Sequence, residues 1–243
     1  MARWHAGGRA APARPAVWAV ALAALVLAAA GARAGQISIA LVGKYTQTMG
    51  PGEQAGAVPL ACWNSATIGS GTLTGLVDES GAATGASVTW WGKTDYTAIA
   101  DTAGNKRLMR GYLTSFTDAG AWVEVSGLSS VFPSGTYDVL VYFDGANGAN
   151  AWETSYRIGA AALTGRDLPN TTFSGTFTAD TGLGGNYVRF GGVTGDGFRL
   201  DVVALGGGGT PINGIQIAHT PEPGSLGLAA AGLALALLRR RGR

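Results

Sequence analysis

The stretch TYDVLVYF at residues 136–143 decides the fold that this sequence predicts. Six of its eight residues are β-branched or aromatic, a composition that suits the pleated surface of a sheet. Gly135 precedes the stretch and Asp144-Gly145 follows it, and residues of these types mark turns between strands. We therefore expect a strand at the centre of a β-sheet here.

Eight further runs of strand-forming residues follow the same pattern and are separated by Gly, Asn, Asp and Pro turns. They lie at residues 36–42, 87–91, 121–126, 153–158, 171–178, 186–190, 198–204 and 212–218. Because no helix-length crossover separates them, the sequence predicts a mainly β fold, an antiparallel two-sheet sandwich resembling a jelly roll. One short helix is expected at residues 105–116, and residues 46–75 are expected to form a long loop that covers one end.

The N-terminus has the three regions of a secretory signal. A basic first region precedes an apolar run at residues 16–30, and a small-x-small pattern with Ala32 and Ala34 follows. We expect residues 1–34 to form a signal helix that signal peptidase removes before Gly35. The mature domain is then expected to extend over residues 35–219.

The C-terminus, residues 220–243, combines three pieces in a fixed order. They are the rigid tripeptide Pro221-Glu222-Pro223, an uncharged apolar segment at residues 224–238 and the basic cluster of Arg239, Arg240 and Arg241. A helix of fifteen residues spans roughly 22 Å, which is short of the ~30 Å hydrocarbon core of a bilayer. We expect a transient transmembrane anchor, with the arginines in the cytoplasm and the domain outside the inner membrane.

This tail resembles the PEP-CTERM sorting signal of Gram-negative bacteria. In that family an exosortase, a membrane transpeptidase-like enzyme, recognises the tail and cuts near the Pro-Glu-Pro motif. Members are exported proteins linked to exopolysaccharide and biofilm production. The resemblance implies an inner-membrane-anchored precursor that moves to the cell surface or extracellular matrix, with exosortase and signal peptidase as processing partners. An ordinary anchor that is never processed is the alternative.

The body resembles a group of exported bacterial modules that often carry the same tail and have no assigned activity. The matching stretches are AVP at residues 57–59, WN at 63–64, KRLMRGYL at 106–113, GTYDV at 135–139, YFDG at 142–145 and PINGIQI at 211–217. The strand pattern is also similar to that of galactose-binding-type jelly rolls. Such a likeness implies a fold and not an activity.

Charge and cysteine content exclude several classes of partner and site. Residues 35–219 carry nine basic and fourteen acidic residues, so the net charge of +2 for the whole chain comes from the targeting segments. Nucleic acid is therefore not expected as a partner. The single cysteine, Cys62, excludes a disulfide within the chain, and its Ala-Cys-Trp setting favours a buried, inert thiol.

Catalysis is not expected. The two histidines, His5 and His219, lie in the signal and beside the tail, which removes Ser-His-Asp and Cys-His chemistry and most zinc sites from the domain. A carboxylate-based glycan-processing enzyme is the alternative, since glycosidases need two acids roughly 5–9 Å apart. No spacing singles out a pair among the candidates Asp95, Asp101, Glu124, Asp138, Asp144 and Glu153. Of these, Glu124 and Asp138 are expected to point to solvent.

One loop has the chemistry of a calcium site. Asp144, Asn147 and Asn150 place hard oxygen ligands in a single loop after the strongest predicted strand. The spacing does not match an EF-hand, and Asn-Gly and Asp-Gly pairs are also required by tight turns, so the turn is the favoured interpretation. No cofactor is expected, and calcium is the one candidate.

Three tryptophans are candidates for weak binding of exopolysaccharide, because the flat CH faces of sugars pack on indole rings. They are Trp63, Trp91 and Trp152, although large aromatics also fill the core of a sandwich. Trp90 and Trp91 are adjacent on a strand and must face opposite sides of it. An exposed tryptophan on a flat face would indicate a polysaccharide-binding protein. Two buried acids in a groove would indicate an enzyme. Burial of every tryptophan would indicate a purely structural module. We expect an exported protein of structural or adhesive type.

Overall fold

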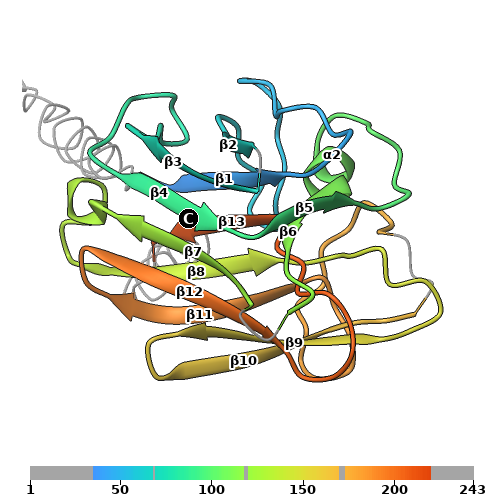
Figure 1. Cartoon of the computed structure of the whole chain (residues 1–243). Coiled ribbons are helices and arrows are strands. Elements are labelled where there is room, and N and C mark those ends of the chain that lie inside the picture. The colour runs from blue at the N-terminus through green and yellow to red at the C-terminus, as the bar shows by residue number, and fades with distance from the viewer. Residues whose placement is uncertain (1–34, 68, 118–119, 170–172, 220–243) are drawn as a thin grey trace, which may run out of the picture. The chain divides into compact units, whose positions relative to one another are not determined.

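The computed structural model describes residues 35–67, 69–117, 120–169 and 173–219. The expected signal helix, the signal residues Ala32 and Ala34, and the whole sorting tail lie outside these ranges. None of the helices in the described ranges is both long enough and apolar enough to cross a membrane. The described chain is mainly β, and two large sheets form a sandwich (Figure 1).

The first sheet has five strands and contains the predicted central strand. They run in the order β11-β8-β13-β1-β2. Their bounds are β1 (Ile37–Val42), β2 (Asn64–Thr67), β8 (Thr136–Tyr142), β11 (Tyr187–Thr194) and β13 (Gly214–Ala218). Neighbouring strands are antiparallel except β1 and β2, which are parallel. The expectation of an entirely antiparallel sandwich is therefore wrong at β2.

The second large sheet has six strands, all antiparallel to their neighbours, in the order β10-β9-β12-β7-β4-β3. They are β3 (Ser70–Thr74), β4 (Ser87–Trp91), β7 (Ala121–Ser126), β9 (Trp152–Ile158), β10 (Ala161–Asp167) and β12 (Gly197–Ala204). A small sheet pairs β5 (Lys93–Tyr96) with β6 (Gly111–Thr114). The helical elements are α2 (Asn105–Arg110) and the 3-10 turn η1 (Leu128–Ser130).

Three local predictions are wrong. The helix ends at Arg110 and not at residue 116, because Gly111 is extended and begins β6. Residues 46–75 are not one loop, since β2 and most of β3 lie within them. The run at residues 171–178 is not a strand in its described part. The observed strands that the sequence did not predict are β2, β3, β5, β6 and β10.

The core explains why the central strand is so apolar. Tyr137, Val139 and Val141 of β8 face the interior between the two large sheets. Leu140 and Tyr142 point to the other side, where a second apolar cluster with Leu108, Met109 and Trp63 covers the sheet. Because β8 is buried on both faces, it carries apolar side chains at nearly every position.

The registers define two ends of the sandwich. Ile37 of β1 pairs with Ile217 of β13, so the described chain begins and ends at the same end, which we call the terminal end. The opposite, distal end is marked by the pairing of Tyr142 with Gly214. The strand β8 runs from the terminal end to the distal end, and Asp144 follows directly after it.

Candidate functional site

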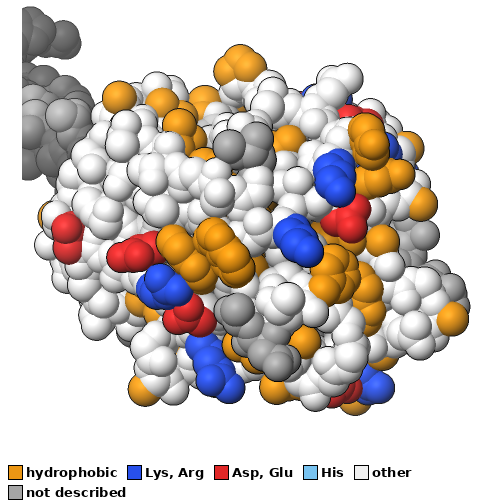
Figure 2. Space-filling view, in the orientation of Figure 1, with side chains coloured by type: hydrophobic (Ala, Val, Ile, Leu, Met, Phe, Trp, Pro, Cys, Tyr) orange, Lys and Arg blue, Asp and Glu red, His pale blue; other side chains and the backbone are white. Residues whose placement is uncertain are grey.

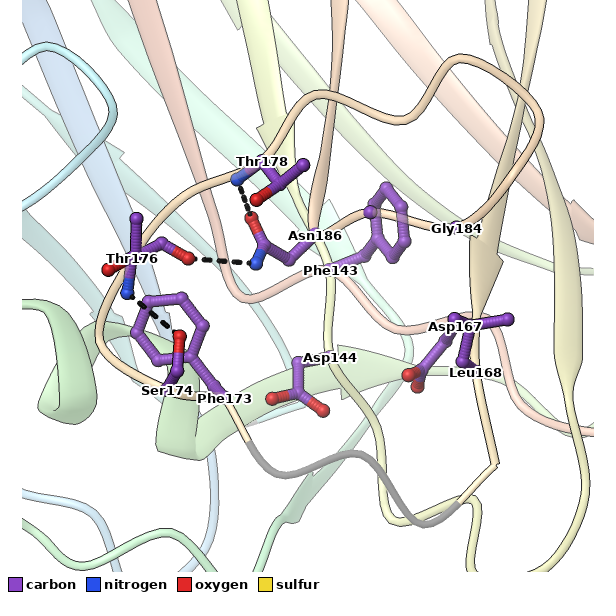
Figure 3. A pocket seen from close by; sticks show the side chains of 11 residues that line it. Phe143, Asp144, Asp167, Leu168, Phe173, Ser174, Thr176, Thr178, Gly184 and Asn186 are labelled. Carbon is purple, nitrogen blue, oxygen red and sulfur yellow. Dashed lines mark hydrogen bonds between the residues drawn. The ribbon is translucent and has the colours of Figure 1, made fainter.

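A cavity of about 250 Å³ lies at the distal end of the sandwich (Figure 3). Its walls come from the chain after β8, from the end of β10 and from two later loop segments. The lining residues are Phe143, Asp144, Asp167, Leu168, Phe173, Ser174, Thr176, Thr178, Gly184, Gly185 and Asn186. Two carboxylates, several hydroxyl and amide groups and two phenyl rings therefore meet in one space.

Asp144 is held in place by its backbone. Its N–H donates to Asn213 Oδ1 at 2.6 Å, and its carbonyl accepts a hydrogen bond from Asn213 Nδ2 at 3.1 Å. Asn213 is fully buried and also donates to the carbonyls of Met109 and Gly111. The side chain of Asp144 takes no part in these bonds, so its position is set by the backbone while its carboxylate lines the cavity beside the backbone N–H of Phe173.

Asp167 ends β10 and is tied to the loop that carries Asp144. Its Oδ2 accepts a hydrogen bond from the backbone N–H of Gly145 at 2.9 Å. The Nδ2 of Asn147 donates to the backbone carbonyls of Asp167 and Leu168, at 3.1 and 2.8 Å. These bonds join the chain segments after β8 and after β10.

The electrostatics of the pair are unusual, because both carboxylates are buried, with 5% of each residue exposed. Burial raises the pKa of Asp144 to about 8, helped by the nearby charge of Asp167 and opposed by the backbone N–H of Phe173. Burial likewise raises the pKa of Asp167 to about 7, opposed by the Gly145 N–H. Across the described ranges, no ion pair reaches either carboxylate.

The opposite wall is organised by Asn186. Its Oδ1 accepts from the backbone N–H of Thr178 at 2.8 Å, and its Nδ2 donates to the carbonyl of Thr176 at 3.1 Å (Figure 3). The amide thus holds the segment with Ser174 and Phe173 against the cavity. Chemically, the space is acidic, rich in oxygen atoms and partly aromatic.

The expected calcium ligands are only partly brought together. Asp144 lines the cavity, but the Asn147 amide is used to bind two backbone carbonyls. Asn150 is exposed and does not line the cavity. Asp167, which the sequence reasoning missed, is the residue that lies with Asp144 instead. Within the described residues, no group of three His, Cys, Asp or Glu side chains is placed to hold a metal.

The three candidate tryptophans have different environments. Trp63 is buried, donates its indole N–H to the carbonyl of Leu60 at 2.9 Å and packs near Tyr142. Trp152 is partly buried, packs edge-on against Phe116 at 6.1 Å between ring centroids, and lies against Gly208. Only Trp91 is well exposed, at 43%, while its neighbour Trp90 is buried, so the two face opposite sides of the strand as predicted.

Trp91 belongs to an aromatic pair on the outer face of the six-stranded sheet. Its cross-strand partner in the β4–β7 pair is Trp122. The guanidinium carbon of Arg199 lies 4.2 Å from the ring centroid of Trp122, and Arg199 also binds Asp201 at 2.8 Å and approaches Glu124 at 3.9 Å. We call these five residues the Trp91–Trp122 face. Figure 2 shows apolar, acidic and basic side chains together over β4, β7 and β12.

Comparisons with known proteins identify the tail and little else. Residues 219–241 match the model of the PEP-CTERM protein-sorting motif. No curated protein matches the chain.

Among solved structures, the β-rich body distantly resembles a domain of two glucuronidases. One is a calcium binding mutant of Bacteroides uniformis β-glucuronidase 2, with 12% identity and a TM-score of 0.40. The other is a Bacteroides uniformis β-glucuronidase, with 10% identity and a TM-score of 0.39. Each match covers 76% of this chain but only 18% of the other chain, and nothing about activity is carried over. The motif, in contrast, implies an exported, membrane-anchored precursor that an exosortase processes.

Proposed function

We propose that this is a non-enzymatic, exported surface or matrix protein of structural or adhesive type, which binds polysaccharide weakly through the Trp91–Trp122 face. The observation that carries the proposal is the exposure of Trp91, 43%, directly opposite Trp122 on the outer side of a broad sheet. Cross-strand neighbours of this kind have Cβ atoms roughly 5 Å apart, so two indoles offer one continuous apolar strip.

The side chains beside the two indoles offer the hydrogen-bond donors and acceptors that a sugar chain needs. The CH face of a pyranose packs on an indole, and its hydroxyls need donors and acceptors beside the ring. Glu124 and Asp201 supply acceptors, and Arg199 supplies donors while it covers one side of Trp122. Because the charges largely compensate one another, a neutral or weakly charged polysaccharide is the expected ligand class.

The position of the face fits an anchored precursor. The described chain leaves the sandwich at His219, at the terminal end, directly where the sorting motif begins. Trp91 is the last residue of β4 and pairs at the end of the β4–β7 ladder away from Ser87 and Ser126. Phe132, which follows β7, packs on His219 with ring centroids 4.8 Å apart, so the Ser126 end of the ladder lies at the terminal end and Trp91 lies away from it.

Binding to the producer's own exopolysaccharide tests the proposal. The full-length protein, purified in detergent, is expected to bind saturably, and Trp91→Ala is expected to weaken binding at least about fivefold, as for the loss of an interface hot spot. Tyr45→Ala is the matched control, since Tyr45 is an exposed aromatic that packs on Tyr96 away from this face. Equal binding by both variants, or no binding by the unmodified protein, would contradict the proposal.

A second candidate, glycan processing, is favoured by one observation. Asp144 and Asp167 are two buried acids whose pKa values are raised toward neutrality, in one cavity. Such a pair has the acid–base character that a glycosidase uses. Release of reducing ends from the polysaccharide, lost in Asp144→Asn, would establish this activity in place of the non-enzymatic role; we expect no release.

A further inference from the structure

We infer that the distal cavity is a binding site for one divalent cation, of the size and ligand preference of calcium, held between the carboxylates of Asp144 and Asp167. This site is separate from the Trp91–Trp122 face and does not depend on polysaccharide binding. The occupant is identified by the chemistry of the cavity alone.

The first step is the charge balance of the cavity. Both carboxylates are more than nine-tenths buried, and no Lys or Arg in the described part of the chain forms an ion pair with them. Removing two anions from water costs several kcal/mol each unless a partner compensates them. Proteins meet this requirement by holding the group in its neutral, protonated form, with a basic side chain, or with a metal ion. When both carboxyl groups are ionised, their two negative charges have no basic partner and match one divalent cation.

The second step is the direction of the side chains. Asn213 binds only the backbone of Asp144, and the Asp144 carboxylate, which lines the cavity, receives the backbone N–H of Phe173. One oxygen of Asp167 accepts the Gly145 N–H, and the rest of that carboxylate faces the cavity. In Figure 3 the two carboxylates are turned toward the same region of the cavity. The surrounding bonds therefore hold two separate segments so that their acids converge.

The third step concerns the type of ion. Among the described residues that line the cavity there is neither histidine nor cysteine, which argues against zinc and other metals that prefer nitrogen or sulfur. Its polar atoms are oxygens and amides, including the hydroxyls of Ser174 and Thr176. Calcium takes six to eight oxygen ligands in flexible geometry and accepts water for several of them. A space of about 250 Å³ accommodates such an ion with its remaining waters.

Thermal unfolding with added calcium tests this inference. The full-length protein in detergent is first stripped with EGTA and then titrated with calcium chloride, with magnesium and sodium chloride as comparisons. At a calcium concentration one hundred times Kd, the melting temperature is expected to rise by about 5–10 °C. Calorimetric titration is expected to give one calcium per chain.

Three variants connect the effect to the site. Asp144→Asn and Asp167→Asn are each expected to lose most of the calcium-dependent shift and at least tenfold in affinity. Both keep the side-chain size, and the backbone bonds of Asp144 to Asn213 remain available, so folding can be verified by the melting curve without calcium. Asp201→Asn removes an acid that lies on the sheet surface and is expected to keep the full response.

The outcomes separate this inference from the proposed function. A calcium shift that persists unchanged in Asp144→Asn and Asp167→Asn, or no shift at millimolar calcium, would overturn it. Retention of polysaccharide binding by Asp144→Asn, together with a normal calcium response of Trp91→Ala, would show that the two sites are independent, as expected.

Discussion

A buried aspartate lies near each end of β8, Asp138 within the strand and Asp144 beyond it, and the two have opposite environments. Asp138, near the terminal end, is 1% exposed and binds Arg189, whose Nε lies 2.9 Å from its Oδ2. The backbone N–H of Gly192 donates to its other oxygen at 2.9 Å. Asp144, just past the distal end, is buried almost as deeply, yet the charged group beside it is another carboxylate, Asp167.

The comparison shows which feature distinguishes a binding site from a structural ion pair. Burial of an acid is common to both ends, so burial alone has no functional meaning. At Asp138 the chain supplies its own cation, and the pair joins β8 to its neighbour β11. At Asp144 the chain supplies a cavity and a second acid and leaves the compensating charge to something else. A structural role is therefore assigned to Asp138, and a binding role to Asp144.

The largest expected effect on stability comes from removing the basic partner of Asp138, so that Asp138 resembles Asp144. Arg189→Met leaves Asp138 buried without its guanidinium partner and is expected to cost about 3–5 kcal/mol of unfolding free energy. Urea denaturation followed by circular dichroism measures the loss. Arg199→Met, at a surface ion pair with Asp201, is the control and is expected to cost less than about 1 kcal/mol. Equal losses in both variants would remove the distinction between the two ends.

At Asp144, by contrast, we expect a substitution to increase the free energy of unfolding. In metal-free protein the unfolded chain releases the Asp144 proton far more readily than the folded chain does, and Asp144→Asn removes this bias, so the variant is expected to be more stable at pH 8 by about 2–4 kcal/mol. Urea denaturation in EGTA measures the difference. A variant less stable than the unmodified protein at this pH would show that the carboxylate is compensated within the chain.

The pH dependence of stability follows from the same pair. The pKa of Asp144, about 8, and that of Asp167, about 7, lie above the ordinary value of 3.8, so the folded state holds protons that the unfolded state has released. Metal-free stability is therefore highest on the acid side and falls as the pH rises from about 4 to 8, by up to about 1.4 kcal/mol per pH unit for each group. Calcium is expected to remove most of this fall. A flat profile in EGTA would contradict the account.

A smaller change in stability is expected when a basic side chain is introduced into the cavity at the distal end. Ser174 lines the cavity with Asp144 and Asp167, so a lysine there adds a cation to the cavity wall. Ser174→Lys is expected to raise metal-free stability at pH 8 by about 1–2 kcal/mol and to abolish the calcium-dependent melting shift. Ser174→Gln is the uncharged control and is expected to keep the shift.

The smallest effect is expected at a half-exposed acid outside the buried pair. Glu153 forms a half-exposed ion pair with Arg166 at 3.3 Å. Glu153→Gln is expected to change stability by less than about 0.5 kcal/mol and to leave the calcium response intact. A larger change in either quantity would mean that exposed acids contribute to the behaviour assigned to the buried pair.

The strands that the sequence predicts well are those whose side chains pack in the core. The stretch TYDVLVYF is buried on both sides of its sheet. Burial of this kind requires apolar side chains, which the composition of the stretch shows. The strands β2 and β10 consist largely of Ala, Ser, Thr and Gly, and they are strands because neighbouring strands offer hydrogen bonds. Residues 173–178 show the reverse case, since Asn186 binds their backbone and makes them a cavity wall. Tertiary pairing overrides β-propensity at such positions.

Of the two acids in the candidate site, the sequence predicted only one, because only one follows a strand that the sequence also predicts. Asp144 follows the clearest strand, so sequence reasoning selected it, whereas Asp167 ends the strand β10 that was not predicted. Its convergence with Asp144 depends on the pairing of β9 with β10 and on the Gly145 and Asn147 contacts. Likewise, the expectation that Asp138 points to solvent is wrong, because β8 is covered on both sides, while Glu124 is exposed as expected.

The most direct test of the account is a crystal structure of the full-length protein grown with calcium, with anomalous diffraction data. The account predicts one anomalous peak in the distal cavity, within 2.3–2.6 Å of oxygens from both Asp144 and Asp167. A cavity without a peak, in which the two carboxyl groups share a proton through a hydrogen bond of about 2.5–2.7 Å, would contradict it.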